Sequence, residues 1–123
     1  MEDNTFKIYE RDDLGEVRIT EDVIAVIAGL AATEVEGVRS LEGNVTNEIV
    51  SKLGRKNLAA GVKAACADGC ASVSLSIEVE MGFSIIEVSR AVQESVKNAV
   101  EGMTGLVVNA VDVEVAGVAI AKE

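Results

Sequence analysis

The chain has 123 residues with 11 basic and 21 acidic side chains, which gives a formal net charge of −10. This length fits one domain, and an apolar fraction of 49% excludes a chain that is disordered throughout. The sequence has no His, no Trp and one Tyr, so the commonest general acid/base, the commonest zinc ligand and most aromatic stacking surface are missing. We therefore expect a protein that is not an enzyme and has no cofactor or metal.

The hydropathy pattern indicates a cytoplasmic protein without a membrane span. The longest uncharged stretch, residues 23–33, has eleven residues, whereas about 20 are needed to cross a bilayer. The first residues lack the basic and apolar regions of a secretory signal. In the reducing cytoplasm, Cys66 and Cys70 are not expected to form a disulfide framework.

The N-terminal residues are acidic and show no hydrophobic period. Residues 1–22 hold eight acidic and three basic side chains. We predict an acidic flexible arm over residues 1–13, a single domain over 14–118 and a short tail over 119–123. The domain begins with a strand over 16–19, with Val17 and Ile19 facing inward, and Thr20 is placed to cap a helix.

The predicted helix over about 21–34 is apolar on almost every face. It is therefore either central in the fold or covered by another protomer, and the sequence leaves both alternatives open. A short strand over 38–41 follows. A short helix over about 46–53 then ends at Gly54.

The second half of the chain has the clearest pattern. Strands over 61–66 and 73–81 flank an Asp68-Gly69 turn, and Ser84 with Glu87 forms a capping box that opens the longest helix, which ends at Gly105. A last strand starts at residue 107. The side chains predicted to face the core are, in the second strand of the hairpin, Val73, Leu75, Ile77, Val79 and Met81; in the helix, Ile85, Val88, Val92, Val96, Ala99 and Met103; and in the last strand, Val107, Val111, Val113 and Val115.

A strand, a long helix and a further strand imply a crossover back onto the same sheet. The sequence therefore predicts an α+β fold: a two-layer sandwich with a mixed sheet of four or five strands and two main helices on one face.

Cys66 and Cys70 are the candidates for thiol or metal chemistry. They face each other across the hairpin if residues 67–69 form a three-residue loop, but not if Asp68-Gly69 is a two-residue turn. Two thiolates without a His supply half of a zinc site, and the Cys-x-x-Cys redox spacing is missing. We interpret these cysteines as small residues beside a turn.

The one basic segment of the sequence, residues 52–63, is the candidate interaction site. It contains no acidic residue, and its candidate contact residues are Lys52, Arg55, Lys56, Asn57 and Lys63. This segment is faintly similar to the loop with which KH modules clamp an RNA backbone, which gives an alternative function in nucleic-acid binding. The net charge of −10 disfavours binding of the phosphate backbone of a nucleic acid. The segment could instead meet the acidic arm of a neighbouring copy, head to tail.

Several motifs occur in order along the chain: Gly15-Glu16-Val17-Arg18-Ile19, Val35-Glu36-Gly37-Val38, Leu53-Gly54-Arg55-Lys56-Asn57-Leu58 with Gly61-Val62, Glu87-Val88, Val92-Gln93, Val96-Lys97 and Met103-Thr104-Gly105-Leu106. Together they cover about residues 14–118 and resemble the alkaline shock protein family, the envelope stress response proteins of Gram-positive bacteria.

This resemblance implies a non-enzymatic scaffold protein in cell-envelope stress homeostasis. It implies that the protein self-associates as a homo-oligomer and binds a small membrane-anchored partner of the same family class. The protein would then lie in the cytoplasm, at the inner face of the cell membrane through that partner, and would bind no nucleic acid.

Overall fold

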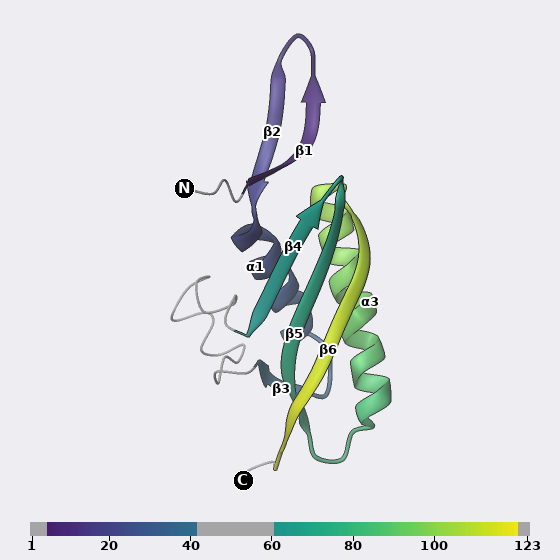
Figure 1. Cartoon of the computed structure of the whole chain (residues 1–123). Coiled ribbons are helices and arrows are strands. Elements are labelled where there is room, and N and C mark those ends of the chain that lie inside the picture. Colours follow the sequence, from purple (N-terminus) through teal and green to yellow (C-terminus); the bar gives the residue numbers. More distant parts are fainter. Residues whose placement is uncertain (1–4, 42–60, 121–123) are drawn as a thin grey trace.

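The structure is a computed structural model that describes residues 5–41 and 61–120. Figure 1 shows its elements in chain order. They are β1 (Thr5–Arg11), β2 (Gly15–Thr20), α1 (Glu21–Thr33), β3 (Val38–Leu41), β4 (Val62–Ala67), β5 (Cys70–Glu80), α3 (Ile85–Thr104) and β6 (Val107–Ala119). The short helix predicted over 46–53 lies outside the described residues.

The main sheet is mixed and has four strands, with β5 at its centre. β6 runs parallel to β5 along its whole length, whereas β4 and β3 are antiparallel to it. Because a strand has two edges, β4 and β3 must share the edge opposite β6. They do so by pairing with different halves of β5, as Figure 1 shows.

Both helices pack on one face of this sheet, so the predicted two-layer α+β sandwich is confirmed. The helices also contact each other, and the Ser95 hydroxyl donates a hydrogen bond of 3.0 Å to the Ala31 carbonyl. Between the layers lies a core of β-branched and small side chains. Its largest fully buried members are Ile24, Ile77, Val73, Val79, Val92, Val96 and Val100.

Helix α1 begins where the sequence predicts. The Thr20 hydroxyl accepts the Val23 N–H at 3.3 Å, which satisfies one of the free donors of the first turn. The helix contacts α3 and strands β2 to β5. Of its large apolar side chains, Leu30 alone is exposed, by 41%. The structure therefore favours the alternative in which this helix is central.

Helix α3 is bounded by Ser84, whose hydroxyl accepts the Glu87 N–H, and by the left-handed Gly105. Its buried stripe differs from the predicted one. Ile85 and Met103 are exposed, and the core positions are Val88, Val92, Val96, Val100 and Thr104. These follow steps of four residues, a row inclined about 26° to the helix axis. The helix thus crosses the twisted strands obliquely. The predicted stripe assumed buried residues that run parallel to the helix axis.

Within the predicted acidic flexible arm, residues 5–11 form strand β1. This strand pairs antiparallel with β2 in a separate two-stranded sheet. Ile8 and Ile19 pack against the core, and this contact offsets part of the cost of ordering the hairpin. The far end of the hairpin extends beyond the main sheet (Figure 1), so Val17, predicted to face inward, pairs with Tyr9 and is exposed.

Two other predicted core residues are exposed because the strand pattern changes near them. A register shift at Asn109 switches the parity of β6, so that Val108 is buried and Val107 is exposed. Strand β5 ends at Glu80, and Met81 lies in the following turn with 59% of its surface exposed. The remaining predicted inward positions of β5 are buried, as expected.

Gly37 should tolerate a side chain less well than Gly105. Its φ is +98°, and a Cβ there would lie 2.7 Å from Val88 Cγ2 and 2.9 Å from Phe83 Cδ2. At Gly105, with φ +78°, a Cβ would meet open space. We expect Gly105→Ala to lower the free energy of unfolding by about 1–2 kcal/mol through backbone strain, and Gly37→Ala to cost about 1–3 kcal/mol more through overpacking.

Urea unfolding of the two variants measures this difference. Equal losses of stability would contradict the predicted clash at Gly37.

Candidate interaction surfaces

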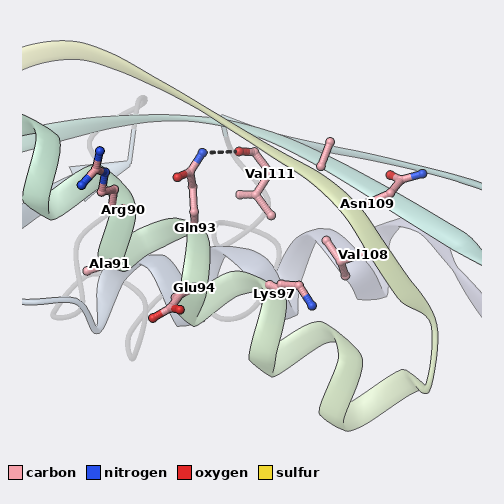
Figure 2. Close-up of a pocket in the computed structure, with 9 residues that line it drawn as sticks. Arg90, Ala91, Gln93, Glu94, Lys97, Val108, Asn109 and Val111 are labelled. Carbon is pink, nitrogen blue, oxygen red and sulfur yellow. Dashed lines mark hydrogen bonds between the residues drawn. The ribbon is translucent and has the colours of Figure 1, made fainter.

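An open groove of about 550 Å³ lies between α3 and the first half of β6 (Figure 2). Arg90, Glu94 and Lys97 stand on its helical wall, and residues 108–111 form the wall on the strand. The described residues that line it include no hydroxyl, thiol or carboxylate pair that could act as a nucleophile with its base.

Two side chains of α3 bind the backbone of β6 across this groove. The Gln93 amide donates a hydrogen bond of 3.0 Å to the Val111 carbonyl, drawn as a dashed line in Figure 2. The Val108 N–H donates one of 2.9 Å to the Glu101 carboxylate, which also accepts two from Lys97 Nζ at 3.0 Å. These bonds satisfy backbone groups that a strand at the edge of a sheet otherwise leaves open.

The hydrogen bond from the Val108 N–H and the bond from Lys97 lower the pKa of the Glu101 carboxyl. Both donors favour the charged carboxylate over the neutral acid, and they outweigh the opposing effect of partial desolvation. Glu101 is therefore a charged anchor between the end of α3 and the start of β6.

Large apolar side chains are exposed at the end of the molecule formed by the β5–α3 turn and the last residues of β6. The Met81 N–H donates a hydrogen bond of 2.8 Å to the Ala119 carbonyl, which brings these two segments together. In Figure 1 this end lies opposite the β1–β2 hairpin. We call it the apolar end, and its members, exposed by 39% to 73%, are Met81, Phe83, Ile85, Ile86, Val118 and Ile120.

The predicted basic site lies mostly outside the described residues. This applies to Lys52, Arg55, Lys56 and Asn57. Lys63 is on β4, exposed on the sheet face away from the helices, in a row with Ser74 and Asp112. The role of the segment, and the alternative of KH-like nucleic-acid binding that depends on it, stay predictions.

The hairpin between β4 and β5 has the two-residue turn. Asp68 and Gly69 both have positive φ, at 55° and 77°, and Ala67 pairs with Cys70. Cys66 pairs with Ala71 and packs against the core, so the two thiols belong to opposite faces of the sheet. Burial, followed by the effects of Cys70 and Glu21, raises the pKa of the Cys66 thiol. A raised pKa disfavours the reactive thiolate.

Within residues 5–41 and 61–120, no group of three His, Cys, Asp or Glu side chains is arranged to hold a metal ion. In the same residues, no helix combines the length and the apolar character needed to cross a bilayer.

Fold and surface together define a small α+β domain whose prominent features are an open groove at a sheet edge and an apolar end. The model of the alkaline shock protein 23 family, described as having a cell envelope-related function, matches residues 9–120. The chain therefore belongs to this family, and the resemblance to the alkaline shock proteins is confirmed.

Full-length relatives support this assignment. The chain is 36% identical over 120 residues to the uncharacterized protein YqhY of Bacillus subtilis, covering 96% of this chain and 89% of the relative. It is 33% identical over 121 residues to the uncharacterized protein Spy1614 of Streptococcus pyogenes serotype M6, covering 97% and 98%. YloU of Bacillus subtilis is 30% identical over 110 residues, covering 88% and 92%.

Among solved structures, variants of MamM CTD are similar in fold. One has a TM-score of 0.49 and 17% identity, covering 78% of this chain and 95% of that domain. Another has a TM-score of 0.48 and 16% identity, covering 82% of this chain and 95% of that domain.

The pKa of Glu101 makes a testable contribution to stability. Because its folded-state pKa lies below the unfolded value of about 4.3, the carboxylate stabilises the fold above that pH. This stabilisation is lost as the pH falls through the folded-state pKa. We expect Glu101→Gln to be less stable than the wild type at pH 7, with a difference that disappears in acid. Urea unfolding between pH 7 and pH 3 measures it.

Glu94→Gln, on the same helix, is the matched control. A deficit of Glu101→Gln that stays constant with pH would show that the carboxylate charge does not stabilise this junction.

Proposed function

We propose that the chain is a non-enzymatic interaction protein of cell-envelope stress homeostasis, which self-associates and binds a membrane-anchored partner. The apolar end is the observation that carries this proposal. Six large exposed apolar side chains lie on the two segments that meet there, and exposed apolar surface marks contacts with other molecules when it is contiguous. A second copy covering this end would remove these side chains from water, at about 25 cal/mol per Å² buried.

The family supports the place of action, because it is described by a cell envelope-related function. In this proposal the chain acts in the cytoplasm, and a partner with its own membrane anchor holds it at the inner face of the membrane. The basic segment 52–63 is a second proposed contact, which would meet acidic side chains of a neighbouring copy.

Self-association through the apolar end predicts a concentration-dependent rise in sedimentation coefficient. Ile86 and Ile120 are exposed by 61% and 73%, so a charge at either position should be tolerated by the fold. We expect Ile86→Lys and Ile120→Lys to shift assembly to at least about tenfold higher protein concentration, since a buried unpaired charge costs more than about 1.4 kcal/mol. Sedimentation velocity over a concentration series measures the shift.

Met103→Lys is the control, because Met103 is 72% exposed near the other end of α3. An equal shift in this control would remove the apolar end as the contact. A chain that stays monomeric at every concentration and binds no membrane-anchored protein of the family would overturn the proposed function.

A further inference from the structure

Strand β6 forms one edge of the main sheet. It spans Val107–Ala119, and one side pairs with β5; no other strand of the described chain pairs with it. An unpaired edge of this length offers a row of backbone donors and acceptors to another chain. Proteins protect such edges, so the presence or absence of protection along β6 is informative.

The hydrogen bonds of β6 identify which residues face the open edge. The Val107 N–H donates to the Gly69 carbonyl and so points toward β5. The Val111 carbonyl accepts from Gln93 of α3 instead and therefore points away from β5. Register is continuous from Ala110 to Val115. Because alternate residues direct their backbone groups to opposite edges, Val113 and Val115 also face away from β5.

The two halves of this edge differ in how their backbone groups are protected. In the first half, Glu101 binds the Val108 N–H and Gln93 binds the Val111 carbonyl, so side chains of α3 close it. In the second half, residues 112–119 contain no Lys or Pro, the residues used most often to protect an edge, so its protection is limited to the charges of Asp112 and Glu114 and the register shift at Ala116. Within residues 5–41 and 61–120, the open stretch is therefore limited to the part of β6 beyond Val111.

The side chains beside this open stretch differ between the two faces of the sheet. Asp112 and Glu114 are exposed on the outer face, where they pair with Ser74 and Ser76 of β5. Val113 and Val115 lie on the helix face and are half-buried against the core. A strand added here would have carboxylates beside one of its faces and apolar side chains beside the other.

We propose that residues 112–119 of β6 bind an extended segment of another protein that alternates basic and apolar residues and adds to the sheet as a further strand. This inference rests on the proposed function and specifies one of its partners. The main-chain hydrogen bonds supply affinity, and the alternating side chains supply specificity. Basic side chains would lie beside Asp112 and Glu114, and apolar ones would cover Val113 and Val115.

A second copy of β6 fits this edge less well. Antiparallel pairing centred on Val113 places Asp112 opposite Glu114 of the other copy, and pairing centred on Glu114 places two glutamates together. Like charges directly opposite each other destabilise a strand pair. Pairing centred on Val115 brings in the register shift at Ala116. A basic strand meets the same register shift but no like charges, and the net charge of −10 favours it further.

The test uses a fluorescent peptide that alternates Val and Lys, titrated with the full chain at physiological salt and followed by anisotropy. One control peptide has the same composition with its lysines grouped together, and a second has Glu in place of Lys. Saturable binding of the alternating Val-Lys peptide, at least about tenfold tighter than either control, is the expected result.

Val113→Pro and Val113→Thr form the matched pair of variants. Proline removes an N–H that points to the open edge, so the ladder with β5 keeps its bonds, whereas threonine retains that donor. We expect about tenfold weaker binding for the proline variant and less than about threefold change for threonine. The double change Asp112→Lys/Glu114→Lys should reverse the preference toward the Glu peptide.

Hydrogen exchange of the wild type keeps the test independent of the folding of the proline variant. Bound Val-Lys peptide should slow exchange at the amides of Val113 and Val115. Equal binding by all peptides, or unchanged exchange at both amides, would overturn the inference. So would a dimer of the chain alone that is lost in Val113→Pro, because the occupant would then be a second copy.

The inference and the proposed function can fail separately. Ile86→Lys should bind the peptide as the wild type does, because Ile86 belongs to the apolar end. If self-association is lost in Ile86→Lys while no peptide binds to the wild type, the proposed function stands and the strand-addition site does not.

Discussion

The fold depends on burying one face of β5. This strand pairs with every other strand of the main sheet, and Val73, Leu75, Ile77 and Val79 lie at 0% to 3% exposure beneath the helices. The valine row of α3 and the small residues of α1 complete the contact. Valine and isoleucine have few rotamers to lose, so such a core is ordered at low entropic cost. With one side of each layer committed to this contact, the surfaces that remain are the sheet edge, the outer face and the two ends.

Local chemistry made much of this predictable. Thr20, Ser84 and Gly105 bound their helices because capping groups act within a few residues, and Asp68-Gly69 forms its turn for the same reason. The two-layer class follows from the alternation of β5 and the crossover to β6. The structure differs from the predictions where residues distant in the sequence determine the local conformation. The parity of β6 changes at Asn109, and β1 forms because β2 is its partner.

The candidate surfaces were less accessible to sequence reasoning. Gln93 and Glu101 bind the backbone of half of an edge strand. The carbonyl and N–H that they bind belong to another element, so no local sequence pattern predicts these hydrogen bonds. The apolar end had a partial signal in the adjacent Ile85 and Ile86, of which Ile85 was assigned to the core. Only the oblique path of α3 across the sheet shows that these residues lie beyond the helix stripe that the sheet covers.

The junction at Thr20 has a mechanical consequence. Thr20 is both the last residue of β2 and the N-cap of α1, with no linker between the two elements. A rotation of the hairpin about Thr20 therefore also displaces the hydroxyl that accepts the Val23 N–H, a bond whose loss costs about 1 kcal/mol. A force applied to the far end of the hairpin would act on the first turn of α1 directly through Thr20.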